Sequence, residues 1–263
     1  MTAPLRSASG RTAVILAGGL GTRLRPVLAN RPKVLAPVAG KPFVVYLFDQ
    51  LKRAGCGKVV LCTGHLGDQV ENTLGRDYQG MPLAYSREPS PLGTGGAVVR
   101  ALPLVESDPF WVLNGDSSIQ ADLSGFAAWF ADRQVLAAML LARVTNRERY
   151  GGVDLAPDGR IVGFFEKGIA SAGLINAGIY LLRREAIAAT PWVGQFSLEY
   201  ALFPEFVRRG VLWGWPSAGT FLDIGTPDSY ATAEAALLRL TSSGSGQDNA
   251  PPPSGHAAPG GRR

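Results

Sequence analysis

A glycine-rich turn directly after a short apolar run constrains this chain more than any other feature. Residues 13–17 read Ala-Val-Ile-Leu-Ala, a pattern typical of a buried strand, and residues 18–21 read Gly-Gly-Leu-Gly. Glycines in such a turn expose backbone N–H groups and let a polyphosphate approach the main chain closely. The order of the two segments predicts a phosphate-binding loop at the end of a buried strand.

Two residues after the glycines fit the same ligand. Thr22 adds a hydroxyl, and Arg23 adds a forked cation suited to phosphate oxygens. A dinucleotide-binding fingerprint that began at Gly19 would need glycine at position 24, where Leu24 stands, and positions 40–42 read Gly-Lys-Pro, which is not a Walker A motif. A dehydrogenase is therefore disfavoured. The glycine-rich segment is interpreted as a phosphate-binding loop of another kind, and the alternative is a turn with a purely structural role.

Apolar strands alternate with amphipathic helices along most of the chain. Strands are expected at residues 58–62, 110–113, 135–142, 153–155, 161–165, 175–182 and 221–224, and helices near 43–51, 66–74, 123–132, 198–207 and from 227 onward. The early strand–helix alternation predicts a parallel, doubly wound half, and the turn at residues 157–159 predicts a hairpin that adds mixed strands. The expected fold is one α/β domain with a central mixed sheet flanked by helices.

The two ends of the chain differ in composition from the rest. Residues 241–263 are rich in Ser, Gly and Pro, and residues 1–11 look similar, so both segments are expected to be disordered. Residues 12–240 are then the folded domain. No apolar run approaches the roughly 20 residues that would cross a bilayer, and no secretory signal is expected, so no membrane partner is predicted.

The distribution of charge argues against nucleic acid as a partner. The formal net charge is +5, but Arg6 and Arg11 contribute +2 of it, and Arg262 and Arg263 against Asp248 contribute +1. The expected domain therefore carries only +2 and has no block of like charge with interleaved aromatic residues. A nearly neutral body with a few placed cations fits a small anionic substrate.

Histidine content narrows the chemistry further. The chain has 2 histidines, His65 and His256, and the second lies in the Ser/Gly/Pro-rich segment. A zinc site built from several histidines is excluded, and a Ser-His-Asp hydrolase would depend on His65 alone. His65 is expected to be a structural loop residue. If the substrate attacks through a phosphate oxygen, that oxygen is already ionised near neutral pH, and no histidine is needed as a general base.

Charged residues that could act on a phosphate occur beside the first loop and at strand ends. Pro32 fixes the backbone before Lys33, whose compact charge suits an α-phosphate that gains negative charge in the transition state. Residues 114–116, Asn-Gly-Asp, end an apolar strand, where open α/β sheets place ligands, and Asp223 ends another. Asp116 and Asp223 could share Mg²⁺, which prefers oxygen ligands and substrate phosphates. Each aspartate taken alone could also be a turn-forming residue.

Two further segments could bind a nucleobase and a sugar. Residues 91–97, Pro-Leu-Gly-Thr-Gly-Gly-Ala, form a second glycine-rich turn that opens a helix and could hold a base through backbone groups. Lys167 could pair with a sugar phosphate, while Glu166 and Asn176 could take sugar hydroxyls. The choice of sugar is expected to depend on the loop that contains Gly152.

Taken together, these motifs resemble the sugar-1-phosphate nucleotidyltransferase family over about residues 12–240. The motifs that carry the resemblance stand here as Leu-Ala-Gly-Gly-Leu-Gly-Thr-Arg (16–23), Pro-Lys (32–33), Leu-Gly-Thr-Gly-Gly-Ala (92–97), Asn-Gly-Asp (114–116), Glu-Lys (166–167), Asn-Ala-Gly (176–178) and Asp-Ile-Gly-Thr-Pro (223–227). The resemblance implies a Rossmann-like, GT-A-like nucleotide-diphospho-sugar transferase fold. Residues 12–240 would form its nucleotidyltransferase catalytic domain.

The resemblance also implies a role for each site residue. Arg23, Lys33 and Asp116 are the implied catalytic residues, and Asp116 and Asp223 are the implied Mg²⁺ ligands. The implied nucleotide-binding residues are Leu16, Ala17, Gly18, Gly19, Gly21, Thr22, Gly93, Thr94, Gly95, Asn114 and Gly115. The implied sugar-phosphate-binding residues are Gly152, Glu166, Lys167 and Asn176.

Within the family, residues 91–97, 195–199 and 219–225 look most like D-glycero-α-D-manno-heptose 1-phosphate guanylyltransferases. The implied reaction transfers GMP from GTP to that heptose 1-phosphate and releases pyrophosphate, for cell-surface polysaccharide or lipopolysaccharide. Alternatives are the same reaction with UTP, dTTP or CTP and a hexose, GlcNAc or MurNAc 1-phosphate, or a non-catalytic regulatory homologue that binds a nucleotide sugar. A cytoplasmic location is expected because nucleoside triphosphates are there. The expected assembly, if any, is a homodimer.

Overall fold

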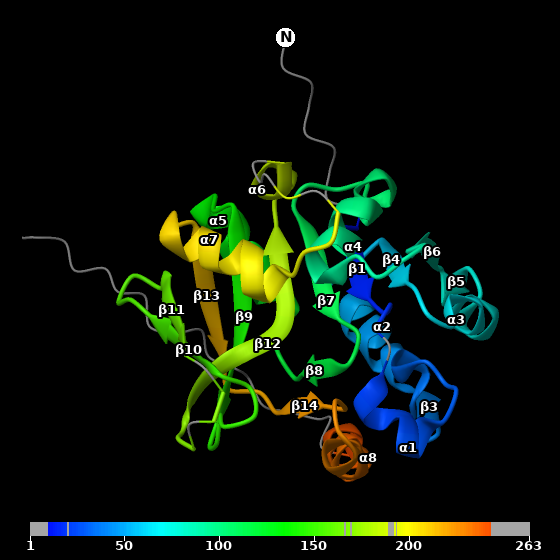
Figure 1. Ribbon diagram of the computed structural model, residues 1–263. Coiled ribbons are helices and arrows are strands. Elements are labelled where there is room, and N and C mark those ends of the chain that lie inside the picture. The colour runs from blue at the N-terminus through cyan, green and yellow to red at the C-terminus, as the bar shows by residue number, and fades with distance from the viewer. Residues whose placement is uncertain are drawn as a thin grey trace, which may run out of the picture.

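A central sheet organises the protein, which the computed structural model describes over residues 10–19, 21–165, 167–168, 170–188, 192 and 194–242. Its strands are β1 (Thr12–Leu16), β4 (Lys58–Thr63), β5 (Asp77–Tyr78), β6 (Met81–Arg87), β7 (Phe110–Asn114), β9 (Ala137–Val144), β12 (Gly173–Leu182) and β13 (Leu212–Ser217). They lie in the order β13-β9-β12-β7-β1-β4-β6-β5 (Figure 1). β1 pairs in parallel with β4 and β7, whereas β12 runs antiparallel to β7 and β9. The mixed α/β sheet expected from the sequence is confirmed.

Helices cover both faces of this sheet, because successive side chains of its buried strands point to opposite sides. In β1, Ala13 and Ile15 belong to one buried cluster and Val14 to the other. The first cluster includes side chains of α2 (Phe43–Arg53), α3 (Gly67–Leu74) and α5 (Leu123–Arg133), and the second includes side chains of α4 (Gly93–Ala101) and α7 (Phe203–Arg208). β1 is therefore held from both sides, and so is the start of the glycine-rich loop that follows it.

Smaller sheets lie outside the central one. The antiparallel pairs are β2 (Pro37–Val38) with β3 (Lys41–Pro42), β10 (Gly152–Leu155) with β11 (Ile161–Phe165), and β8 (Ser117–Ile119) with β14 (Phe221–Asp223). The β10–β11 pair is the expected hairpin, but it forms a sheet of its own. Within the central sheet, the antiparallel strands are β12, which runs against β7 and β9, and the short β5, which runs against β6.

Hydroxyl side chains cap the start of the later helices. The Ser197 hydroxyl accepts hydrogen bonds from the N–H groups of Glu199 and Tyr200, and a π-helical stretch, Leu198–Leu202, precedes α7. Thr226 and Ser229 exchange hydrogen bonds where α8 (Pro227–Ser242) begins. α8 continues past the expected domain boundary at residue 240, while residues 1–9 and 243–263 of the two terminal segments lie outside the described residues. None of the helices in this described part is both long and apolar enough to cross a lipid bilayer.

The longer strands that the sequence pattern did not predict lie toward the edges of the sheet. β6 contains Pro82, and β13 contains Gly214 and Pro216, so neither reads as a continuous apolar run or as a strict alternation. β13 is the outermost strand on one side, and β6 is bordered on the other by the short β5 alone. Pro216 is tolerated because β13 pairs with the central sheet on one side only, and Pro82 stands at the start of β6, before its pairing with β4 begins at Leu83.

Candidate active site

A cleft of about 400 Å³ opens where β1 and β7 end. Its lining includes these residues predicted from the sequence: Leu16, Ala17, Gly18, Gly19, Gly21, Thr22, Arg23, Lys33, Gly93, Thr94, Asn114, Gly115 and Asp116. The structure thus brings together the first glycine-rich loop, the second glycine-rich turn and the Asn-Gly-Asp segment. Gly95 is the exception among the predicted nucleotide-binding residues, since it is buried and does not line the cleft.

Close contact between strand ends shapes the floor of the cleft. The Gly115 N–H donates to the Leu16 carbonyl oxygen at 3.0 Å. A Cβ on Gly115 would lie 2.5 Å from that oxygen and 2.6 Å from Cγ1 of Val34, so only glycine fits here. This close approach places Asp116, the next residue, beside the first loop and the Lys33 segment.

The second glycine-rich turn packs against Phe196. The Phe196 carbonyl oxygen accepts hydrogen bonds from the N–H groups of Gly95 at 2.9 Å and Gly96 at 3.4 Å. A Cβ on Gly95 would lie 2.1 Å from the Phe196 ring, and one on Gly93, whose φ is +69°, would lie 2.4 Å from the Phe196 carbonyl oxygen. The backbone donors of Gly95 and Gly96 are thus already used inside the protein, unlike what the sequence predicted for this turn.

Two glutamates that the sequence analysis did not assign to a site line the cleft, Glu88 and Glu199. Glu88 follows β6, and its Oε2 accepts a hydrogen bond from the Leu92 N–H at 3.0 Å. Burial raises the pKa of the Glu88 carboxyl. The Glu199 Oε2 accepts hydrogen bonds from the hydroxyls of Thr94 at 2.8 Å and Ser197 at 2.9 Å. The signal that could have revealed Glu88 is its position between a strand and the second glycine-rich turn, but that strand was not predicted.

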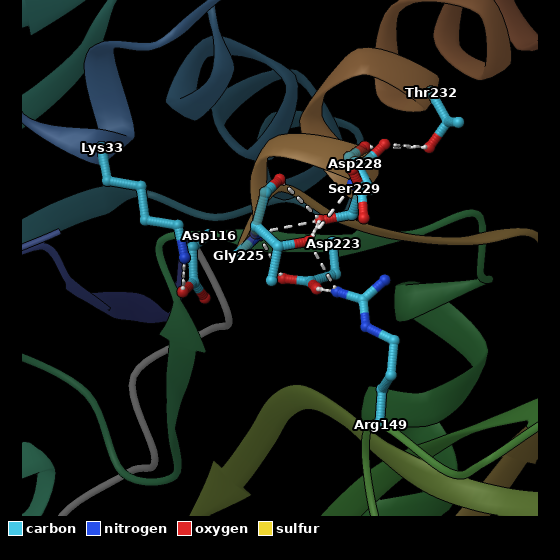
Figure 2. Close-up of polar contacts among 9 residues, drawn as sticks. Lys33, Asp116, Arg149, Asp223, Gly225, Asp228, Ser229 and Thr232 are labelled. Atoms are coloured by element: carbon cyan, nitrogen blue, oxygen red, sulfur yellow. Dashed lines mark hydrogen bonds and ion pairs between the residues drawn. The ribbon is translucent and has the colours of Figure 1, made fainter. Parts of the chain in front are cut away.

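Asp116 and Asp223 lie together although they are far apart in the sequence (Figure 2). Asp116 directly precedes β8, Asp223 is the last residue of β14, and Ser117 pairs with Asp223 in that small sheet. The Ile224 N–H also donates to the Asp116 carbonyl oxygen at 3.0 Å. Burial raises the pKa of Asp223, and the negative charge of Asp116 raises it further. The two carboxylates are therefore close enough to repel each other.

Each carboxylate is paired with a cation (Figure 2). The Lys33 Nζ lies 2.5 Å from Oδ2 of Asp116, and the Arg149 Nη2 lies 3.2 Å from Oδ2 of Asp223. Lys33 follows Pro32 in a short 3₁₀ turn, and its side chain is only 14% exposed. The sequence predicted the Lys33 position beside the loop, but it gave no reason to select Arg149, which belongs to none of the predicted motifs.

Comparison with known proteins identifies the family. The family model described as "Nucleotidyl transferase" matches residues 12–239. The chain belongs to the nucleotidyl transferase family. The match spans the glycine-rich loop, Asp116 and both glutamates of the cleft, and also Asp223, which lies beside the cleft without lining it.

Several nucleotidyl transferases similar to this chain act on sugar 1-phosphates. The chain is 35% identical over 225 residues to the D-glycero-alpha-D-manno-heptose 1-phosphate guanylyltransferase of Aneurinibacillus thermoaerophilus. This match covers 86% of this chain and 97% of that protein. It is 32% identical to the mannose-1-phosphate guanylyltransferase of Mycobacterium tuberculosis, over 86% of this chain and 64% of that protein. The crystal structure of HddC from Yersinia pseudotuberculosis matches with a TM-score of 0.78 and 32% identity, covering 86% of this chain and 99% of that one. This nucleotidyl transferase is a sugar-1-phosphate nucleotidylyltransferase, and the expected fold and enzyme class are confirmed.

Of the residues of this nucleotidyl transferase that were predicted to hold the sugar phosphate, the three that the structure describes do not line the cleft. Lys167 is exposed, and a Cβ on the buried Gly152 would collide with the Arg147 guanidinium. The Asn176 amide is engaged inside the protein, since its Oδ1 accepts from the Gly178 N–H at 2.8 Å and its Nδ2 donates to the Tyr180 hydroxyl at 2.8 Å. Glu166 lies outside the described residues. The roles of these four residues toward a sugar stay predictions.

Proposed function

We propose that this enzyme transfers GMP from GTP to D-glycero-D-manno-heptose 1-phosphate, forming the GDP-sugar and pyrophosphate. The observation that carries the choice of base is the Glu88 carboxylate on the wall of the cleft. Two similar proteins, at 35% and 33% identity, are D-glycero-alpha-D-manno-heptose 1-phosphate guanylyltransferases, and HddC has been crystallised with GMP-PN. The reaction would take place in the cytoplasm, where nucleoside triphosphates are available, and would supply cell-surface polysaccharide.

Glu88 has the chemistry that distinguishes guanine from the pyrimidines. Guanine presents two neighbouring donors, N1–H and the N2 amino group, and one carboxylate can accept from both. Uracil and thymine present a single N–H between two carbonyl oxygens, which a carboxylate repels. The Leu92 N–H donates a hydrogen bond to Oε2 of Glu88. Oε1 lies so near Gly18 that a Cβ added to this glycine would be 2.6 Å from that oxygen. The carboxylate is thus fixed against the start of the phosphate loop, where it could face a bound base.

The remaining cleft residues fit the transfer of a nucleotidyl group. An oxygen of the sugar phosphate would form a bond to the α-phosphorus in line, and the bond from that phosphorus to the leaving pyrophosphate would break. Backbone N–H groups of the first loop, with Thr22 and Arg23, would bind the triphosphate. Lys33 would neutralise the charge that grows on the α-phosphate, so positioning and electrostatics supply the acceleration.

The donor set of Asp116 and Asp223 fits Mg²⁺, the cation that the family typically uses. Within the described residues, no three His, Cys, Asp or Glu side chains cluster as in a closed metal site. Two carboxylates that repel each other would be stabilised by a divalent cation, and the other coordination positions would be left to phosphate oxygens and water, as Mg²⁺ prefers. Mg²⁺ held there would shield the negative charge of the phosphates.

Pyrophosphate release in the presence of Mg²⁺ tests the proposed substrates. GTP, UTP, dTTP and CTP are each combined with heptose, mannose, glucose and GlcNAc 1-phosphates. GTP with the heptose 1-phosphate should give the highest kcat/KM. Turnover with a different pair alone would contradict the proposed substrates and keep the reaction. No turnover by folded protein that still binds nucleotide would favour the regulatory alternative.

Glu88→Gln should lower kcat/KM for GTP by about 10- to 100-fold and improve UTP relative to GTP. The amide oxygen can accept one guanine N–H, but the amide nitrogen is a donor that faces the second donor of the base. The measurement is kcat/KM for all four nucleotides. Glu106→Gln is the control, because Glu106 pairs with Lys58 away from the cleft. An equal loss for all four nucleotides would show that Glu88 does not contact the base.

The affinity for GTP should also fall at acidic pH. Burial raises the pKa of Glu88, so this carboxyl becomes protonated at a higher pH than an ordinary glutamate. Only the ionised form accepts both guanine donors, and GTP affinity should therefore be lost as the pH falls through that raised pKa. The KM for GTP, measured from pH 8 downward, should rise in the wild type. Glu88→Gln should show a flatter profile, and identical profiles would contradict this role.

A further inference from the structure

We propose that Arg149 binds the phosphate group of the sugar 1-phosphate. Before the substrates bind, Asp223 forms an ion pair with Arg149, and a divalent cation that binds the Asp223 carboxylate releases Arg149. This inference rests on the proposed metal-binding role of Asp223. Arg149 lies in the connection between β9 and β10, and its Nη2 donates to Oδ2 of Asp223 at 3.2 Å and to the Thr226 hydroxyl at 3.0 Å (Figure 2).

A divalent cation that binds Oδ2 of Asp223 places its positive charge next to the Arg149 guanidinium, which already contacts that oxygen. Oδ1 of Asp223 accepts a hydrogen bond from the Gly225 N–H at 2.7 Å, and Oδ2 is occupied by Arg149. The Gly225 donor belongs to the backbone directly after β14 and is fixed there. The Arg149 side chain is 46% exposed and can turn away. Binding of a cation at Oδ2 therefore displaces Arg149 and leaves its guanidinium without a carboxylate.

Lys33 and Arg149 approach the two carboxylates from different sides, so each cation could contact a different phosphate group. Lys33 lines the cleft on the side of the glycine-rich loop, whereas Arg149 does not line the cleft and reaches Asp223 from the opposite side (Figure 2). When both carboxylates turn to a divalent cation, Lys33 faces the phosphates of the nucleotide. Arg149 is left on the side away from the glycine-rich loop, and an in-line displacement with pyrophosphate leaving toward that loop would bring the acceptor from there. The forked Arg149 guanidinium matches two oxygens of a phosphate.

The Arg149 guanidinium also contacts an aromatic ring beside the carboxylate pair. The guanidinium carbon lies 5.4 Å from the centre of the Tyr150 ring, and that ring meets Phe221 edge-on at 5.3 Å. Phe221 begins the strand that Asp223 ends. Arg149 therefore stays beside the carboxylate pair in either position.

The competition between Arg149 and the cation for Asp223 is tested by Mn²⁺ binding to the full chain without substrates, measured by electron paramagnetic resonance. Arg149→Ala removes the competing cation and should tighten Mn²⁺ binding by about 2- to 5-fold. Arg160→Ala is a matched control, because Arg160 is 47% exposed and pairs with Asp158 at 2.7 Å in the β10–β11 turn. It should leave Mn²⁺ binding unchanged. Unchanged or weaker Mn²⁺ binding in Arg149→Ala would show that Arg149 does not compete with the cation for Asp223.

The phosphate role is tested by steady-state kinetics at saturating Mg²⁺, with the substrate pair that the wild type uses best. Arg149→Ala should raise the KM for the sugar 1-phosphate by about 10- to 50-fold and leave the KM for the nucleotide within about twofold. Arg149→Lys should recover part of the loss, since it restores the charge without the fork. An unchanged KM for the sugar 1-phosphate would overturn the role.

A failure of the proposed function gives a different result. If Asp223→Asn does not weaken Mn²⁺ binding, the proposed metal site is wrong, whatever Arg149 does. If the wild type turns over no sugar 1-phosphate, inorganic phosphate with saturating Mn²⁺ is the probe, measured by calorimetry. Arg149→Ala should then weaken phosphate binding, and equal binding in the variant and the wild type would refute the inference.

Discussion

Replacing Lys33 with alanine should lower turnover by about 10³-fold while leaving the fold intact. Lys33 lines the cleft beside the first loop, and its Nζ lies 2.5 Å from Oδ2 of Asp116. In the proposed reaction it is the charge that meets the α-phosphate, where negative charge grows in the transition state. The measurement is the rate of pyrophosphate release, with circular dichroism and the thermal midpoint as checks on folding.

Lys58→Ala is the matched control for this variant. Lys58 also makes an ion pair of 2.5 Å, with Glu106, and its side chain is 18% exposed against 14% for Lys33. Because Lys58 lies outside the cleft, its loss should change stability about as much and leave turnover near the wild-type rate. Wild-type turnover in Lys33→Ala would refute the α-phosphate role. An equal loss in both variants would indicate a general loss of structure.

Asp223→Asn should lower turnover by about 10²- to 10³-fold and raise the Mg²⁺ concentration needed for half-maximal activity by about 10-fold or more. An amide oxygen can still accept the Gly225 N–H, which Oδ1 of Asp223 now accepts at 2.7 Å, so the turn after β14 should persist. The change therefore removes the charge and keeps the shape. The measurement is a Mg²⁺ titration of pyrophosphate release.

Asp158→Asn is the control for this second variant. Asp158 is a partly exposed aspartate that pairs with Arg160 in the β10–β11 turn, as Asp223 pairs with Arg149. It should leave the Mg²⁺ requirement unchanged. A Mg²⁺ requirement in Asp223→Asn equal to that of the wild type would show that this carboxylate does not bind the cation.

The parts of the site that the sequence predicted are those whose backbone demands particular residues. The first glycine-rich loop follows a buried strand, and Gly115 is required because a Cβ would lie 2.5 Å from the Leu16 carbonyl oxygen. Such demands act over a few residues, so they are visible in the sequence. The central sheet was predictable for the same reason, because its inner strands are short apolar runs.

The parts that the sequence did not reveal depend on contacts between distant segments. Glu88 reaches the cleft at the end of β6, whose Pro82 breaks the strand pattern. Arg149, between β9 and β10, contacts Asp223 at the end of β14, and neither segment carries a local signal for the other. The N–H groups of Gly95 and Gly96 are taken by Phe196, so a turn that looked free in the sequence is already occupied. Tertiary packing decided each of these outcomes.

The small β8–β14 sheet also sets when the enzyme can first work during its own synthesis. A chain leaves the ribosome from its N-terminus, and domains fold as their last necessary segment appears. The glycine-rich loop, Lys33 and Asp116 all emerge well before Asp223, which ends one of the last elements of the fold. A nascent or prematurely terminated chain thus carries the parts expected to bind a nucleotide and lacks half of the carboxylate pair. In the proposed reaction, a chain whose β14 has not yet emerged would bind a nucleotide without turning it over.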